Sequence, residues 1–424
     1  MFTRRKFLEA TAAGTLSSSM LRADDSAKPV CRRLAVISNE WVPDSPIQQI
    51  VDRLLVGYPH EGEWQTPGFK IASAYVAQRS DADLTKSRCK AFGFSVQRSV
   101  AKALRCGGRR LAVHGVLLFS NSQEPLRNGR RSCDTSQSTL FDQVAKVFAQ
   151  DRRSVPVFIE GRPADSLEAV NQIVDHGQKM QIPLLTGSSL PLTWRLPSVD
   201  LPYDARVDEA LMVGFGDFET GAFHALEGMQ AMLERRQHGE TGVRSVQLIE
   251  GDEVWKAAQN NRWSQDLLEA ALSRSNQLQG ISRSLAKPQD LVRNGQLPKL
   301  VKQPVALCIE YLDGTRATLL MLDGAVGDFT FAAKASDAQA EAQIISTLFY
   351  WAPEPNFAHT AEHAHQIVQL MRHGRTTVPL ERTVLVTGLL EQAAKLKGLA
   401  GQKVSTPELK ISYRPNSASQ YARS

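Results

Sequence analysis

The chain has 424 residues, of which 42% are hydrophobic and 22% are charged, and its formal net charge is +6. This composition is typical of a globular protein, and the length is sufficient for two domains with separate cores. The basic residues are dispersed and do not alternate with aromatic residues in a sustained run, which argues against a nucleic-acid-binding surface.

The N-terminal sequence TRRKFLEATAAGTLSSSML has paired arginines, then Phe7-Leu8, then small and mildly apolar residues. It resembles a twin-arginine export signal, with Glu9 in place of the usual lysine. We therefore predict a signal over residues 1–25, export to the periplasm or cell envelope, and no integral membrane segment in the mature form. A basic start without a targeting role is the alternative.

From residue 30 onward, strand patterns alternate with helical patterns. Strands are predicted at 34–38, 69–77, 111–120, 155–159 and 182–185, and helices at 47–55, 81–93, 99–104, 140–149 and 166–179. The connections between strands are long enough for crossover helices. This alternation predicts an α/β fold with a doubly wound parallel sheet over residues 30–190.

The pattern changes after Pro191. A long helix is predicted in GAFHALEGMQAMLERR, and strands are predicted at 246–248, 305–311, 317–322 and 328–333. Asp313-Gly314 is the expected hairpin turn. We predict a second α/β domain over residues 191–415 with a largely antiparallel open sheet, and then a loose tail at 416–424.

The order of RLAVIS, FKIASAYVAQ, LAVHGVLLFS, VPVFIEGRPADSLEAV, IPLLTGSSLPLTWR and ETGAFHALEGMQ resembles the Gfo/Idh/MocA (glucose–fructose oxidoreductase/inositol dehydrogenase) family. A closer resemblance, to exported bacterial proteins with similar TWR and FHALE segments, extends to TPELKISYRP. The family resemblance implies a Rossmann-like dinucleotide-binding domain, an NAD(P) cofactor, a sugar or polyol substrate and a homo-oligomer.

The resemblance places the cofactor at the ends of the predicted strands, against Ser38, Asn39, Tyr75, Ser120, Asn121 and Glu160. The sequence at these ends argues against ordinary NAD(P) binding. The first turn, SNEWVPDSP, has no glycine to admit the pyrophosphate, and it contains two prolines and two acids. Ala77 stands where the family has the acid that binds the ribose. We interpret Asp81 and Asp83 as caps of the next helix.

The turn Glu160-Gly161-Arg162-Pro163 lies where the family has Glu-Lys-Pro with a catalytic lysine. Neither alignment register leaves a lysine there. Arg162 keeps a positive charge that could bind a substrate oxygen, but an arginine cannot do the acid–base work of a lysine. A surface arginine that caps the turn is the alternative interpretation.

His224 matches, with one extra residue, the histidine of the family's Asp-x-Gly-x-His helix. The resemblance implies a general acid or base that lines the substrate pocket. The alternative is a helix-face histidine packed between domains. Trp194 and Arg195 end the parallel domain, where they could reach a substrate or fix the joint between domains.

The segment HTAEHAH contains His359, Glu362 and His363 in the inverted zinc-peptidase pattern. We interpret it as a chance match and predict no metal site, because the five cysteines are irregularly spaced and no zinc-peptidase fold is indicated.

Three hypotheses remain. The first, which we favour, is a relative with degraded cofactor and catalytic motifs that binds a carbohydrate-like ligand or a partner. The second is an active NAD(P)-dependent sugar or polyol oxidoreductase with an altered site. The third is a zinc hydrolase. The losses at the phosphate turn, the ribose acid and the lysine position favour the first, because they fall together at one cleft.

Overall fold

The computed structural model describes residues 32–120, 136–279, 287–336, 342–399 and 401–423. Residues 32–424 form one compact unit. The predicted export signal over residues 1–25 and the predicted cofactor residue Asn121 lie outside the described residues. Within the described part of the chain, no helix has the length and apolar character needed to cross a bilayer.

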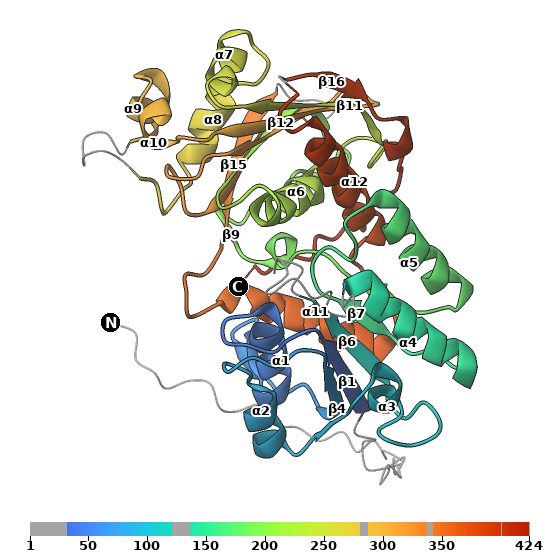
Figure 1. Ribbon diagram of the computed structural model, residues 1–424. Helices are drawn as coiled ribbons and strands as arrows, with labels where there is room; N and C mark the ends of the chain where they lie inside the picture. Colours follow the sequence, from blue (N-terminus) through green and yellow to red (C-terminus); the bar gives the residue numbers. More distant parts are fainter. Residues whose placement is uncertain (1–31, 121–135, 280–286, 337–341, 400, 424) are drawn as a thin grey trace, which may run out of the picture. The chain divides into compact units, whose positions relative to one another are not determined.

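The first sheet is parallel throughout, and its described strands run in the order β5-β4-β1-β6-β7-β8 (Figure 1). Its strands are β1 (Arg32–Ser38), β4 (Phe69–Val76), β5 (Ser95–Val96), β6 (Gly115–Phe119), β7 (Val157–Ile159) and β8 (Leu184–Leu185). A small antiparallel hairpin of β2 (Tyr58–His60) and β3 (Glu63–Gln65) lies outside this sheet. The central strands are continuous apolar runs because both faces of the sheet are buried.

Helices cover both faces of this sheet, which confirms the predicted doubly wound arrangement. One face packs against α1 (Pro46–Val56) and α11 (Ala361–His373). The other packs against α3 (Val100–Leu104), α4 (Gln137–Asp151) and α5 (Leu167–Lys179). The short α2 (Thr85–Phe92) ends at Gly93, whose positive φ of 71° closes the helix.

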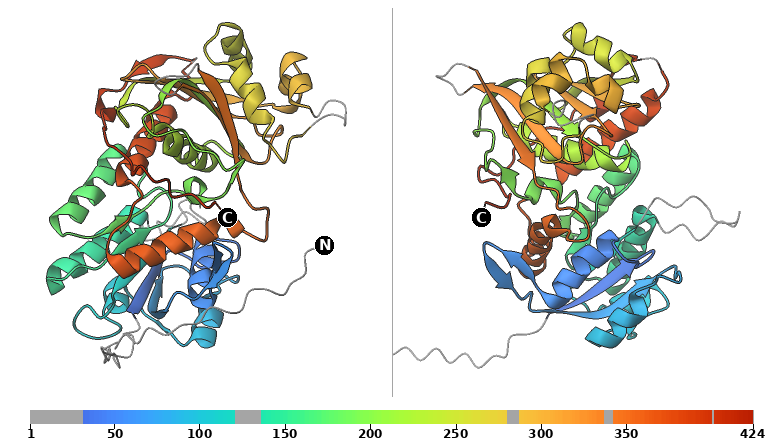
Figure 2. Two further views of the ribbon diagram at one scale, coloured as in Figure 1. Left: turned by 180° about the vertical axis from the view of Figure 1, so that it is seen from behind. Right: turned by 90° about the vertical axis from the view of Figure 1, so that its left-hand side faces the viewer.

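Helix α11 comes from the C-terminal half of the chain but belongs to the core of the parallel sheet. Ala361 and Ile367 share a buried cluster with Leu34 and Val36 of β1. Figure 2 shows this orange helix packed beside the blue α1 and β1. A boundary at residue 191 therefore does not divide the chain into two self-contained domains, because the parallel sheet needs residues from both halves.

The second sheet has the described strand order β16-β11-β12-β13-β10-β14-β15-β9. Its strands are β9 (Arg195–Leu196), β10 (Arg206–Gly214), β11 (Val243–Glu250), β12 (Val305–Tyr311), β13 (Arg316–Met321), β14 (Phe329–Ser336), β15 (Gln343–Phe349) and β16 (Lys403–Ser405). Within the described residues, β10 and β13 pair in parallel and the other neighbours are antiparallel. The predicted, largely antiparallel sheet is confirmed, including the β12–β13 hairpin at Asp313-Gly314.

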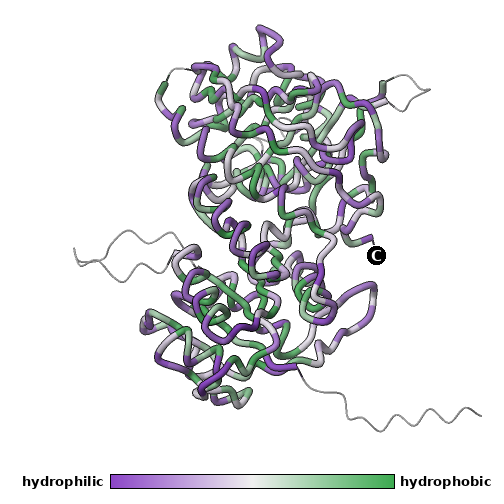
Figure 3. Tube along the Cα trace, turned by 90° about the vertical axis from the view of Figure 1, so that its right-hand side faces the viewer, coloured by the Kyte–Doolittle hydropathy of each residue, from purple (hydrophilic) through white to green (hydrophobic). Residues whose placement is uncertain are grey.

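Two sets of helices cover this sheet. One face packs against α6 (Thr220–Leu233) and α12 (Leu380–Leu396). The other face is covered by α7 (Glu253–Gln259), α8 (Gln265–Leu272), α9 (Pro288–Arg293) and α10 (Leu297–Leu300). Three short 3-10 helices complete the described elements: η1 (Leu190–Leu192), η3 (Ala358–Thr360) and η4 (Pro407–Leu409). Figure 3 shows hydrophobic and hydrophilic segments alternating along the backbone trace.

The C-terminal tail is docked, so the prediction of a loose tail at 416–424 is wrong. Tyr421 and Ala422 are buried, at 7% and 8% exposure. The guanidinium carbon of Arg195 lies 4.1 Å from the centre of the Tyr421 ring, and the Ala422 amide donates to the Leu192 carbonyl at 2.9 Å. Tail composition alone suggested a solvated end, but the tail has an aromatic contact with a buried arginine and hydrogen bonds to residues earlier in the chain.

Candidate functional site

A cleft of about 2080 Å³ opens at the carboxyl ends of three neighbouring parallel strands. Its lining includes Ser38 and Asn39 after β1, Ser120 after β6 and Glu160 after β7. Strand β1 has β4 as its neighbour at one edge and β6 at the other, so the strand order reverses direction at β1. Open α/β sheets bind ligands at this kind of switch point.

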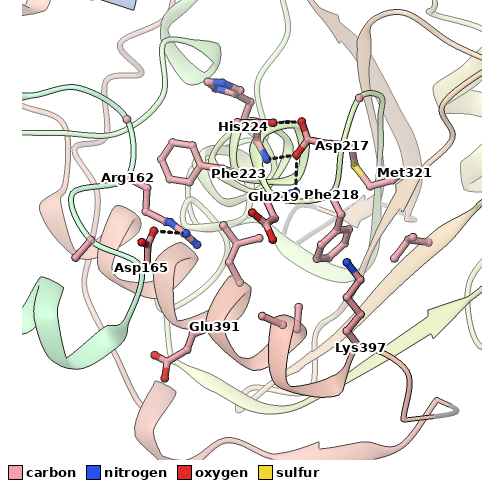
Figure 4. Close-up of a pocket in the computed structure, with 18 of the residues that line it drawn as sticks. Arg162, Asp165, Asp217, Phe218, Glu219, Phe223, His224, Met321, Glu391 and Lys397 are labelled. Carbon is pink, nitrogen blue, oxygen red and sulfur yellow. Dashed lines mark hydrogen bonds and ion pairs between the residues drawn. The ribbon is translucent and has the colours of Figure 1, made fainter. Parts of the chain in front are cut away.

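The opposite wall comes from the second sheet and its helices. It includes the turn before α6, His224 on α6, and the C-terminal part of α12 from Leu390 onward. Figure 4 shows Arg162 and Asp165 at one wall, and Asp217, Phe223 and His224 at another. Residues from both halves of the chain therefore form one site.

The first turn of the parallel sheet places one large side chain in the core and an acid at the cleft. Trp41 is fully buried and stacks on Phe94 with ring centres 6.0 Å apart. The Ser38 hydroxyl donates to the Glu40 carbonyl at 2.6 Å, and Glu40 itself lines the cleft. Pro46 occupies the first turn of α1, which removes one of the backbone donors that an anion would use there.

This turn does not fit the pyrophosphate of a dinucleotide. The usual turn brings bare glycine backbone and helix N–H groups against the phosphates. Here the turn has no glycine, and it presents an acidic residue and a proline to the cleft. Its residues therefore do not fit NAD(P).

The ribose position is altered as well. Ala77 follows β4, and its backbone N–H donates to the Ser38 carbonyl at 3.0 Å. The Asp83 carboxylate accepts from the Thr85 amide at 3.2 Å and from its hydroxyl at 2.5 Å, so it caps α2 as predicted. Tyr75 is not among the cleft-lining residues and packs against the core that includes α3. The structure thus corrects the assignment of Tyr75 to the cofactor.

The turn after β7 does lie in the cleft. Glu160, Arg162 and Pro163 all line it, and Gly161 has a positive φ of 63°. The Arg162 guanidinium donates to the Asp165 carboxylate at 2.5 Å, so a neighbouring acid already binds its charge. This pairing matches the interpretation of Arg162 as a turn arginine, although its position still allows contact with a ligand.

Glu160 is the titratable group of this wall with a clearly altered pKa. Burial raises its pKa to about 7, because the charged form loses hydration there. At neutral pH the carboxyl is therefore present in both protonated and ionised forms, and it can donate or accept a hydrogen bond. This property differs from the cofactor-binding role that we predicted for Glu160.

His224 lines the cleft from α6, as predicted for the pocket histidine. Its Nδ1 lies 2.7 Å from the Ser188 hydroxyl, and its ring centre lies 5.0 Å from that of Trp351. Burial lowers its pKa to about 4, so the imidazole is neutral at pH 7. Gly221 lets the start of α6 pack closely against Phe215, because a Cβ at this position would meet the Phe215 carbonyl oxygen at 2.2 Å.

Trp194 and Arg195 lie outside the cleft lining, which corrects their assignment to the substrate. Arg195 is 2% exposed and donates to the Asp200 carboxylate at 2.7 Å. The Trp194 ring packs edge-on against Tyr350 at 5.9 Å. The alternative interpretation, in which the pair fixes a joint of the structure, agrees with these contacts.

The residues of the zinc-peptidase pattern have other partners. The His359 Nδ1 accepts from the Ala352 amide at 3.2 Å, and Glu362 lies 3.0 Å from Nδ1 of His60. His363 is buried edge-on against a phenylalanine. Within the described residues, no group of three or more His, Cys, Asp or Glu side chains could hold a metal ion. The zinc hydrolase hypothesis has no support in this arrangement.

No protein-family model matches the sequence, and no curated protein matches it. Solved structures do resemble the fold. GenD2 from gentamicin A biosynthesis, in complex with NAD, has a TM-score of 0.54 at 13% identity, and the match covers 88% of this chain and 96% of GenD2.

Two inositol dehydrogenases resemble the chain to a similar degree. The myo-inositol 2-dehydrogenase from Lactobacillus plantarum has a TM-score of 0.51 at 10% identity, with 88% of this chain and 99% of that chain covered. The scyllo-inositol dehydrogenase from Lactobacillus casei has a TM-score of 0.51 at 10% identity, with 88% and 98% covered. The chain therefore shares the fold of these three proteins, a parallel sheet covered by helices followed by a mixed, largely antiparallel sheet.

Proposed function

We propose that this protein is a divergent Gfo/Idh/MocA-like member that binds a carbohydrate-like ligand in the cleft and does not use NAD(P) as an ordinary dehydrogenase does. The observation that carries this proposal is the first turn of the parallel sheet, where Glu40 and Pro46 line the cleft and the phosphate-binding glycines are absent. The opposite wall of the cleft is retained, and His224 lines it.

The charge of the cleft supports the same proposal. Its described lining has eight acidic residues and four basic ones, although the whole chain has a net charge of +6. The acids are Glu40, Glu160, Asp165, Asp217, Glu219, Glu250, Asp323 and Glu391, and the bases are Arg162, Lys302, Lys395 and Lys397. Two of the bases are paired with acids of the same lining. An acidic cleft disfavours phosphates and favours neutral or amine-bearing ligands.

The first prediction concerns the nucleotide. Calorimetry with NAD⁺, NADH, NADP⁺ and NADPH at millimolar concentration is expected to show no binding, and the absorbance of the purified protein is expected to show no nucleotide. Stoichiometric bound nucleotide would contradict the proposal and support an active oxidoreductase. That second function is favoured by one observation: two acid–base groups, Glu160 and His224, remain in the cleft.

The second prediction concerns the ligand. In saturation-transfer NMR, myo-inositol, glucose and glucosamine are expected to bind, and glucose 6-phosphate is expected to bind at least tenfold more weakly because of the acidic lining. His224→Ala should weaken binding about threefold to tenfold, the range for one lost hydrogen bond. The control is His176→Ala, which changes a half-exposed histidine on α5. Tightest binding of the phosphate would contradict the ligand class.

A further inference from the structure

A buried contact beside the cleft wall favours one tautomer of His224. The Ser188 hydroxyl oxygen accepts from the Leu190 amide at 3.0 Å and lies 2.7 Å from the Nδ1 of His224. The oxygen has a second lone pair, but within the described residues the hydroxyl hydrogen has Nδ1 as its acceptor, and an Nδ1–H group would leave this hydrogen unpaired in a buried position. The contact therefore favours Nδ1 as the acceptor and a neutral imidazole with its hydrogen on Nε2.

Among the described residues, Ser188 is the hydrogen-bond partner of this imidazole, and its own position is fixed by its surroundings. Ser188 is 5% exposed and precedes the 3-10 helix η1. The residue before it, Gly187, has a φ of 112°, where a side chain would be strained. A Cβ on Gly187 would also meet the carboxylate oxygen of Glu227 at 3.0 Å and the Thr383 hydroxyl at 2.8 Å. The segment therefore packs directly on Glu227.

Glu227 lies one turn after His224 on α6 and is 1% exposed. Its carboxyl oxygens have no well-formed hydrogen bond within the described residues. Burial raises its pKa to about 7, while Arg382, the Thr383 hydroxyl and the Ser188 backbone N–H act to lower it. Unpaired buried carboxyl groups are costly, so a group retained here needs an explanation.

Two explanations can be separated. In the simpler one, Glu227 only balances the charge of Arg382. Arg382, however, already has a bidentate partner, because its guanidinium donates to both carboxylate oxygens of Glu234 at 2.9 and 2.6 Å. Charge balance with Arg382 therefore does not explain why Glu227 packs against Gly187 and Ser188.

We propose that Glu227 and Ser188 form a buried positioning pair: Glu227 supports the backbone at Ser188, and the Ser188 hydroxyl holds His224 as a neutral imidazole with Nε2–H as the hydrogen-bond donor to the cleft. The ligand would then present an oxygen acceptor, such as a hydroxyl, to this nitrogen. This last step rests on the proposed function. The tautomer itself does not, because it is a property of the protein without ligand.

The test is the ¹⁵N NMR spectrum of the full chain labelled at histidine, with the His224 signals assigned by their loss in His224→Gln. The wild-type protein is expected to show a protonated Nε2 and an unprotonated Nδ1 at pH 7. Ser188→Ala should remove this preference and shift both signals toward a mixture of tautomers. Ser189→Ala is the matched control, since this neighbouring serine is also buried and has no side-chain cap bond.

Glu227 is tested by two variants that separate its oxygen from its charge. Glu227→Gln keeps a polar group of the same shape against the Gly187–Ser188 segment and should retain the wild-type His224 signals. Glu227→Met fills the same space with an apolar group and should shift them toward those of Ser188→Ala. A wild type with protonated Nδ1, or unchanged signals in Ser188→Ala, would overturn the proposal. Unchanged signals in Glu227→Met would overturn the role of Glu227.

The ligand arm uses myo-inositol as the probe. Ser188→Ala should weaken its binding about threefold to tenfold, and Ser189→Ala should leave it unchanged. If the NMR result is as expected but myo-inositol does not bind the wild type, the positioning pair stands and the proposed ligand class fails. If myo-inositol binds equally to both serine variants, the donor role of His224 fails.

Discussion

Arg382→Met is expected to lower the free energy of unfolding by about 3–5 kcal/mol, because it leaves a buried carboxylate without its cation. Arg382 and Glu234 are 6% and 2% exposed and are joined by two hydrogen bonds. The Tyr413 hydroxyl also donates to Glu234 at 2.8 Å. Burial lowers the pKa of Arg382, but attraction to Glu234 outweighs this and raises it overall. Chemical denaturation at pH 7 measures the loss.

The control for this variant is an ion pair at the surface. Arg293 is 66% exposed and lies 2.6 Å from Glu269. Arg293→Met should cost less than about 1 kcal/mol. The double variant Arg382→Met/Glu234→Met should recover much of the loss, because it removes both buried charges. Equal losses of unfolding free energy in Arg382→Met and Arg293→Met would show that the buried ion pair contributes no more to stability than a surface pair.

The protein is also expected to lose stability as pH falls below about 6.5. Burial lowers the pKa of His359 and of His363 from 6.5 to about 3. Below pH 6.5 the unfolded chain therefore binds protons at these positions that the folded chain does not bind. The stability present above pH 6.5 is lost as pH falls toward 3, by on the order of 1 kcal/mol per pH unit for each histidine.

Two acids, buried Glu227 and partly buried Glu160, act in the opposite direction over part of this range. The pKa values of Glu160 and Glu227 are raised from 4.5 to about 7, so the folded state binds the extra protons between pH 4.5 and 7. They offset part of the histidine effect in that interval. The decline should therefore be shallow from pH 6.5 to 4.5 and steeper below pH 4.5, where the unfolded chain protonates its acids as well.

His363→Met tests this origin of the acid sensitivity. It should reduce the pH dependence of the free energy of unfolding by on the order of 1 kcal/mol per pH unit between pH 6 and 4. Urea denaturation at several pH values gives the slope. His373→Met is the control, because His373 is exposed at the end of the same helix. A slope that His363→Met leaves unchanged would remove this histidine as a cause.

Local sequence patterns predicted the strands that are apolar along most of their length. The bounds of β12 agree with the prediction because its apolar run is bordered by Pro304 and by the Asp313-Gly314 turn. Strand β10 was missed, since its first half, RVDE, carries three charges. Its buried half pairs with β13 and β14, and pairing partners so far apart in sequence leave no local signal.

The site residues that follow the ends of strands could be predicted from the sequence. Those whose position depends on side-chain packing could not. The positions of Ser38, Ser120, Glu160 and His224 in the cleft follow from the order of the elements. Tyr75 and Arg195 were misplaced because the sequence does not reveal which face of a strand or which partner a side chain has. One missed signal was available: Glu227 is an acidic residue in a helix whose neighbouring residues are mostly apolar.

The packing of α11 against β1 also constrains how the chain can fold. One face of the parallel sheet is covered only in part, by α1, until residues 361–373 have been synthesised, more than 300 residues after β1. A nascent chain would therefore leave the apolar surface that α11 covers exposed for most of its synthesis. Contacts so distant in sequence slow folding and prolong the risk of aggregation. Truncation before α11 should yield an insoluble product and not a smaller domain, so the two sheets fold as partners.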